Sequence, residues 1–248
     1  MFAQTETINQ IIKFQRENNM AKAKKDSFTI EPLSTTTVKM ELIGDSPLML
    51  HARSRYYEKS ECWKQNHDKG AKMPEIYSQS KNLWEGLITG IHWEKPIEYH
   101  DENIMLYTEE EWKHYMETNR PCILSQAFKK SFKESFVTFL KESTGKNGTD
   151  ITRALSVDEF IHPIKFSTVH VESTIVPTKG IGGSTVVCNA NVFDGWSTEI
   201  TVSCPDTVFP IETIIQLIET TGKYIGIGSQ RSNGYGKYHI NPENVTII

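Results

Sequence analysis

The sequence has no long apolar run, no paired cysteines and no excess of positive charge. No apolar segment approaches the roughly 20 residues of a transmembrane helix, so we expect no membrane contact. The scattered cysteines form no C-x-x-C pair, and we therefore expect no metal and no cofactor. The start, MFAQTETINQ, lacks the charged and apolar segments of a signal peptide. We expect a cytoplasmic protein.

The net charge of −4 argues against a polycation that coats nucleic acid without specificity. The charge is unevenly distributed, however, and affinity follows the field at the site. Segments 49–72 and 223–237 are basic, and 223–237 contains no acidic residue, whereas 94–117 is acidic. Such runs are most often solvated surface. Basic and acidic faces on one molecule could also stack copies of it head to tail.

The order of strands and helices is the main evidence for the fold. Strands alternate apolar and polar residues, and helices repeat apolar residues every three or four positions. These patterns predict strands over 35–43, 161–175, 185–204 and 235–240 and helices over 125–142 and 210–221. The resulting β-α-β-β-α-β order is that of an α+β, ferredoxin-like (RRM-like) domain. We expect one antiparallel sheet with both helices on one face and the other face free, as RRMs use it to stack bases.

Several local details accompany this prediction. Ser125 is expected to cap the first helix. The apolar face of that helix is formed by Phe128, Phe132, Phe136, Phe139 and Leu140. Asp194-Gly195 predicts a kink inside the third strand. In the second strand, Ile164 and Phe166 share one phase and Val169 and Val171 the other, and this slip predicts a bulge.

Three segments describe the domain organisation. Residues 1–30 are expected to form an amphipathic arm and 31–248 the ferredoxin-like domain. Residues 52–120, a large insertion after the first strand, are polar and lack a clean period. Because a structureless loop of that length is unusual in a compact domain, we expect an inserted subdomain.

The strongest local motif is the segment 226–236, GIGSQRSNGYG, with four glycines. Glycine permits positive φ and removes the Cβ that would hold a ligand away. Backbone N–H groups can then face a phosphate, Arg231 adds a fork of donors, and Tyr224 and Tyr235 could stack on bases. The loop is not a Walker motif, because a strand follows it. The alternative is a tight turn that merely lets the last strand dock.

The segment GIGSQRSNGYGKYHI, between a helix and a short closing strand, resembles the C-terminal glycine-rich loop of the RAMP superfamily, the RRM-like proteins of CRISPR effector complexes. The element VKMELIGDSPLMLH is similar to the first strand and turn of that group. Asn191–Trp196 and the strand after it resemble single-copy phage and prophage relatives, which implies a phage- or prophage-encoded protein in the host cytoplasm. The resemblance covers 35–51 and 121–240 and leaves out the insertion.

This resemblance implies a sequence-tolerant protein that binds single-stranded RNA or DNA and acts as a non-enzymatic backbone subunit. Its partners would be copies of itself along the strand, as a homo-oligomer, or other subunits of a complex. The hairpin between the two middle strands would act as a thumb, a projection that wedges between bases of the bound strand. The residues expected to contact nucleic acid are Gly226, Gly228, Ser229, Gln230, Arg231, Gly234, Tyr235, Gly236, Lys237, Lys223, Lys179, His51 and Arg53.

Two other classes of function stay open. Some RAMP relatives are metal-independent endoribonucleases that use a positioned general acid or base. His51, near the first strand, could have that role in this chain. It could equally be a polar residue at a strand end. Asp45 and Asp68 could act with a metal, although no acid pair at ligand spacing supports either. The third class is a structural or inhibitory interaction protein without affinity for nucleic acid, which would use the arm and the acidic insertion.

Overall fold

The computed structural model describes residues 34–51, 83–97, 107–177 and 185–248. The largest element is a sheet with the strand order β10-β1-β9-β6-β4-β3, in which β5 also pairs with β9. Its strands are β1 (Thr35–Gly44), β3 (His92–Trp93), β4 (Pro121–Leu124), β5 (Ser156–Val157), β6 (Ile161–Lys165), β9 (Ser197–Pro205) and β10 (Tyr238–Ile247). The predicted arm (1–30), Arg53 and Lys179 lie outside the described residues.

Four strands of this sheet reproduce the predicted ferredoxin-like order. The neighbours β10, β1, β9 and β6 pair antiparallel throughout. The helix α6 (Ser125–Ser135) lies between β1 and β6 in the chain, and α9 (Ile211–Thr220) lies between β9 and β10. The predicted α+β fold class is therefore confirmed.

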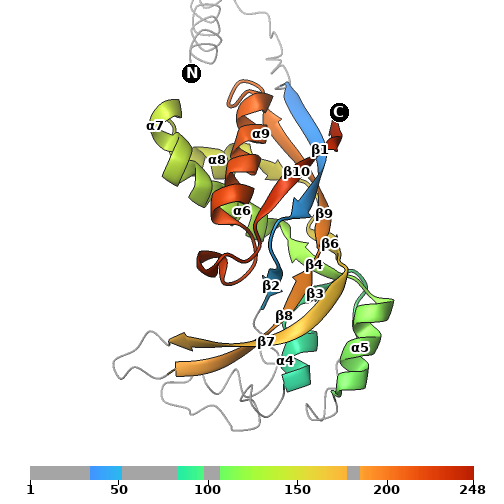
Figure 1. Cartoon of the computed structure of the whole chain (residues 1–248). Coiled ribbons are helices and arrows are strands. Elements are labelled where there is room, and N and C mark those ends of the chain that lie inside the picture. Colours follow the sequence, from blue (N-terminus) through green and yellow to red (C-terminus); the bar gives the residue numbers. More distant parts are fainter. Residues whose placement is uncertain (1–33, 52–82, 98–106, 178–184) are drawn as a thin grey trace, which may run out of the picture.

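The helices α6 and α9 lie on the same side of the sheet (Figure 1). The helices α6 and α9 each continue into a π-helical turn: α6 into η3 (Phe136–Leu140) and α9 into η4 (Thr221–Ile225). The short helices α7 (Lys141–Thr144) and α8 (Gly148–Ala154) follow η3. Among the described helices, none has the length and apolarity needed to cross a bilayer.

The core forms where this helical layer meets the sheet. Phe128, Phe132 and Phe136, spaced four apart, are buried against it, as the helical period predicts. The predicted cap at Ser125 is wrong. The N-cap is Leu124, and the Ser125 hydroxyl instead donates to the carbonyl of Phe160 at 3.1 Å.

The opposite face of the sheet is polar. Lys39 of β1 pairs with Glu199 of β9 at 2.8 Å, and the hydroxyls of Thr37 and Ser203 are 3.0 Å apart. On this face the strands β10, β1, β9 and β6 present no Phe, Tyr or Trp side chain, since Tyr238 is buried on the other side. These four described strands therefore provide no aromatic platform for the base stacking that RRMs perform on their open face.

A separate three-stranded sheet has the order β2-β8-β7. Its strands are β2 (Leu48–Leu50), β7 (Thr168–Pro177) and β8 (Thr185–Asp194). In Figure 1 the β7–β8 hairpin extends away from the body. This is the predicted thumb, and its tip, 178–184 with Lys179, lies outside the described residues.

The two middle strands are each divided, which the sequence predicted only in part. The predicted kink at Gly195 is present, with φ 55°, and separates β8 from β9. The expected single strand 161–175 is instead β6 and β7, because the chain leaves the main sheet at Phe166. The last strand runs to Ile247, beyond the predicted end at 240, since its second half pairs with β1.

The described parts of the insertion contain α4 (Leu83–Thr89), β3 and α5 (Glu109–Thr118). They pack into the same hydrophobic core as the rest of the chain. Asn191 of β8 connects them, because its side chain accepts from the Trp112 indole at 2.8 Å and donates to the carbonyl of Leu87 at 2.8 Å. The division into arm, domain and inserted subdomain stays a prediction.

Candidate nucleic-acid interface

The glycine-rich loop is fastened to the turn between β1 and β2 by main-chain hydrogen bonds. The amide of Gly236 donates to the carbonyl of Pro47 at 2.8 Å, and the amide of Ser229 to that of Met49 at 2.8 Å. Within the loop, the amide of Ile227 donates to the carbonyl of Gly236 at 2.9 Å. Two distant parts of the chain thus hold the loop in one conformation.

Three of the loop glycines are required by contacts of the chain with itself. A Cβ on Gly236 would lie 1.8 Å from the Ile227 oxygen, and one on Gly226 would lie 2.8 Å from the Gly236 oxygen. A Cβ on Gly228 would lie 2.6 Å from the oxygen of Met49. All three have positive φ, between 68° and 83°. The missing side chains here allow close packing, as the tight-turn alternative expects.

The outer tip of the loop, Gln230–Gly234, differs from these inner glycines. A Cβ on Gly234 would meet no atom within 4 Å. Gln230 has a left-handed φ of 53°, and its side-chain oxygen accepts from the Asn233 amide group at 2.8 Å. Between them lies the short 3-10 turn η5 (Arg231–Asn233). The Ser46 hydroxyl fixes the far end by donating to the Gly234 carbonyl at 2.7 Å.

The tip contains unpaired backbone donors. Among the described residues, the amides of 230, 231 and 232 have no hydrogen-bond partner. Ser232, Asn233 and Gly234 are exposed. A backbone N–H is a strong donor that needs an acceptor, and a braced turn of consecutive donors suits an anionic oxygen.

The cations around the loop are only partly free. The Arg231 guanidinium donates to Ser131 at 3.2 Å and to Glu134 at 3.0 Å, both on α6, and its side chain is only 23% exposed. Lys237 donates to the carbonyl of Tyr224 at 2.6 Å, and burial, together with nearby Arg231, lowers the pKa of its ammonium. Lys223 is exposed. The predicted phosphate fork of Arg231 thus already has partners within the chain.

Other expected site residues meet the loop from the side of β2 and the hairpin. The Ser229 hydroxyl donates to the carbonyl of His51 at 3.4 Å. Burial lowers the pKa of the His51 imidazole, which is therefore neutral at pH 7. The Tyr235 hydroxyl lies 2.7 and 2.8 Å from the two carboxylate oxygens of Glu172 on β7. The structure thus brings His51, the loop and the hairpin together.

One aromatic side chain is not where the helical period placed it. Phe139 was expected on the buried face of its helix but is 44% exposed. The π-helical turn η3 shifts the register after Phe136, so the three-to-four spacing no longer applies. Its ring instead contacts that of Tyr224, which is 54% exposed, with ring centroids 5.2 Å apart. The sequence offers no signal for this turn.

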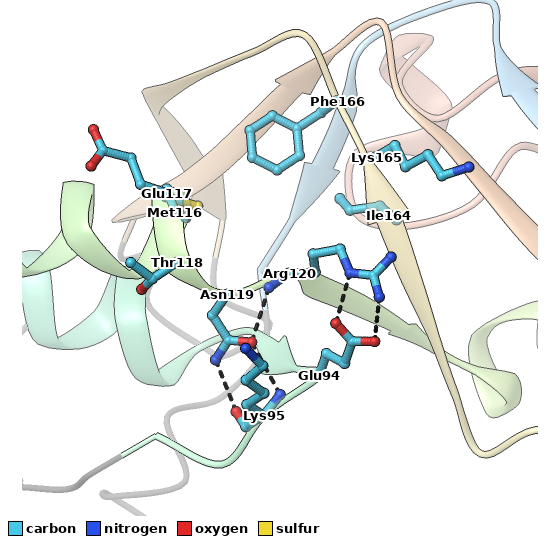
Figure 2. Close-up of a pocket in the computed structure, with 10 residues that line it drawn as sticks. All are labelled: Glu94, Lys95, Met116, Glu117, Thr118, Asn119, Arg120, Ile164, Lys165 and Phe166. Atoms are coloured by element: carbon cyan, nitrogen blue, oxygen red, sulfur yellow. Dashed lines mark hydrogen bonds and ion pairs between the residues drawn. The ribbon is translucent and has the colours of Figure 1, made fainter.

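A surface pocket of about 670 Å³ lies elsewhere, between the end of α5, the segment that follows β3, and β6 (Figure 2). The guanidinium of Arg120 forms two hydrogen bonds with the carboxylate of Glu94, at 2.7 and 2.5 Å. This pairing neutralises the guanidinium that could otherwise bind an anion in the pocket. None of the residues expected to bind nucleic acid lines it.

No family model matches the chain, and no curated protein matches it. The chain is similar to a solved chain of the Type III-B Cmr-beta bound to cognate target RNA, with 10% identity and a TM-score of 0.46, covering 98% of this chain and 67% of that one. It is also similar to Cmr6 from Pyrococcus furiosus, with 11% identity and a TM-score of 0.39, covering 84% of this chain and 98% of that one.

Proposed function

We propose that this protein binds single-stranded nucleic acid, RNA or DNA, at the tip of the glycine-rich loop. The observation that carries the proposal is the braced turn Gln230–Gly234, whose amides 230 to 232 have no partner among the described residues. Lys223 is exposed a few residues away, and Lys237 is held beside it through Tyr224. Phosphate oxygens would accept from the amides, and the lysines would supply favourable charge.

The expected binding is tolerant of sequence. Contacts to phosphate position a strand but do not read its bases. The tip offers main-chain donors, and the described strands offer no large aromatic side chain for stacking on the open face of the sheet. We therefore expect affinity to depend on strand length and salt rather than on base order.

Fluorescence anisotropy of labelled RNA and DNA single strands, at two salt concentrations, tests the proposal. Affinity should fall steeply as salt rises, because bound phosphates release counterions. Lys223→Glu should weaken binding by about tenfold at the lower salt concentration. Its matched control is Lys39→Glu, which reverses an exposed lysine on the open face of the sheet. No binding to either strand would refute the function, and an equal loss in Lys39→Glu would transfer it to the open face.

We also propose that copies assemble along a strand. Three acidic residues begin α5 (Glu109, Glu110 and Glu111), whereas the loop segment 223–237 contains no acid. Opposite charges on different parts of one subunit favour head-to-tail contacts between copies. Light scattering with and without an oligonucleotide measures the mass, and a monomer under both conditions contradicts assembly.

One observation favours the endoribonuclease as a second candidate. His51 adjoins the loop through its main-chain carbonyl, which lies 3.4 Å from the Ser229 hydroxyl. Burial lowers the pKa of its imidazole, which favours the neutral form that can accept a proton from a ribose hydroxyl. The protein is incubated with the labelled RNA, with and without EDTA, and the products are separated on a denaturing gel. Shortened RNA shows cleavage, and intact RNA shows binding alone. Products that disappear with His51→Ala would make the protein an enzyme.

A further inference from the structure

Two aromatic rings stand exposed where the two long helices end. Phe139 belongs to η3 and Tyr224 to η4, the π-helical turns that follow α6 and α9. Their ring centroids are 5.2 Å apart, with planes inclined by 43°. Both side chains are about half exposed, at 44% and 54%. Leaving two large rings in water forgoes the free energy of their burial, and π-helical turns are frequent at functional sites.

Positive charge surrounds the pair. The Lys223 ammonium lies 5.2 Å from the centroid of the Tyr224 ring. The Lys237 ammonium binds the carbonyl of the same tyrosine at 2.6 Å. Glu134, whose charge acts on Lys237, is already paired with Arg231 at 3.0 Å. An exposed ring flanked by ammonium groups suits a ligand that is aromatic and anionic together.

We propose that Tyr224 and Phe139 form a stacking site for an unpaired nucleobase, with Lys223 and Lys237 contacting its flanking phosphates. The proposal deepens the function proposed above and rests on it. The glycine loop begins directly after η4, so one strand can place a phosphate on the loop tip and a base on the rings. Stacking accepts any base, because every base has a π-face. The site therefore adds affinity without adding sequence preference.

The experiment compares two single strands of equal length and equal phosphate number. One carries bases throughout, and the other is abasic at several adjacent positions. Removing a stacked base lowers affinity by about five- to a hundredfold in such sites. The wild-type protein should prefer the strand with bases by at least about fivefold. The double variant Phe139→Leu/Tyr224→Leu should bind the abasic strand as the wild type does and lose this preference.

Two controls keep the result interpretable. Phe160→Leu removes another exposed aromatic ring, 65% exposed and outside the pair, and should retain the preference. Tyr224→Trp supplies a larger ring at the same position and should also retain it. Circular dichroism and thermal midpoints confirm that each variant is folded.

Three outcomes would overturn the stacking site. The double variant could keep the full preference for bases, or it could lose affinity for both strands equally, which would indicate loss of charge placement rather than stacking. It could also abolish self-association while binding both strands normally, which would make the pair a contact between copies. Each outcome leaves the proposed function standing, whereas failure of the wild type to bind either strand refutes the function itself.

Discussion

The inner and outer halves of the glycine-rich loop use glycine for opposite purposes. At Gly226, Gly228 and Gly236 the absent Cβ makes room for the chain's own carbonyl oxygens. At Gly234 the absent Cβ leaves open space, and only the positive φ of 93° requires glycine. A glycine-rich segment can therefore combine a packed base with an exposed rim. The composition of the segment does not distinguish the two, but the distances to the nearest atoms do.

The largest expected effect separates these halves by stability. Gly236→Ala would place a Cβ 1.8 Å from the main-chain oxygen of Ile227 at a φ of 68°. The backbone at residue 236 must therefore move away from Ile227. We expect a loss of at least about 3 kcal/mol in the free energy of unfolding. Gly234→Ala meets no atom and should lose about 1 kcal/mol, from the left-handed backbone alone. Urea unfolding measures both, and equal losses would erase the distinction between inner and outer glycines.

A second prediction tests whether Arg231 supports the loop or binds the ligand. Arg231→Ala removes the contacts to Ser131 and Glu134 and should destabilise the protein by about 1–2 kcal/mol. Glu134→Gln removes the charge that competes for the guanidinium, which should raise oligonucleotide affinity about threefold at low salt. Anisotropy and urea unfolding provide the two readouts. If Glu134→Gln changes stability alone, Arg231 is a structural residue only.

A third prediction concerns the link between the outer half of the loop and the hairpin. Tyr235→Phe removes the hydrogen bond to Glu172 and should destabilise the protein by about 1 kcal/mol. Glu172→Gln and the double variant complete a double-mutant cycle measured by urea unfolding. Fully additive losses would show that the loop and β7 are not coupled through this pair.

The smallest expected effect is a change of the free energy of unfolding with pH, which arises from two histidines outside the loop tip. Burial lowers the pKa of His162, which is 1% exposed, and of His51. In the unfolded chain each imidazole binds a proton near its ordinary pKa of about 6.5. Below that pH the unfolded state binds more protons, so stability should fall as the pH decreases through about 6.5 and stay level just above it.

Unfolding in urea at several pH values measures this slope. In the fold, Nδ1 of His162 contacts the carbonyl of Glu199 at 3.1 Å and its ring packs edge-on against Phe128. His162→Phe keeps the ring and removes the titration, so its free energy of unfolding should depend less on pH. An unchanged slope would assign the effect to other groups.

Periodicity predicted much of the fold, because regular elements depend on neighbours a few residues apart. The first strand, expected over 35–43, is Thr35–Gly44, and the kink at Gly195 lies where Asp194-Gly195 indicated. The slip of phase after Phe166 predicted a bulge at the point where β6 ends and β7 begins. The change of sheet at that point was not predicted, because it depends on the partner strand. The exposure of Phe139 was missed for a similar reason, since a single π-helical turn breaks the spacing that buried Phe128 and Phe132.

For the site, the sequence by itself determined which loop positions need a backbone without a side chain, and it placed basic residues beside them. Only the tertiary structure decided which groups stay available to a ligand. The guanidinium of Arg231 is bound by Glu134, 97 residues earlier in the chain, and the Tyr235 hydroxyl by Glu172, 63 residues earlier. Left-handed backbone is a local property of one residue, whereas a hydrogen-bond partner is chosen by whichever distant segment the fold brings within about 3 Å.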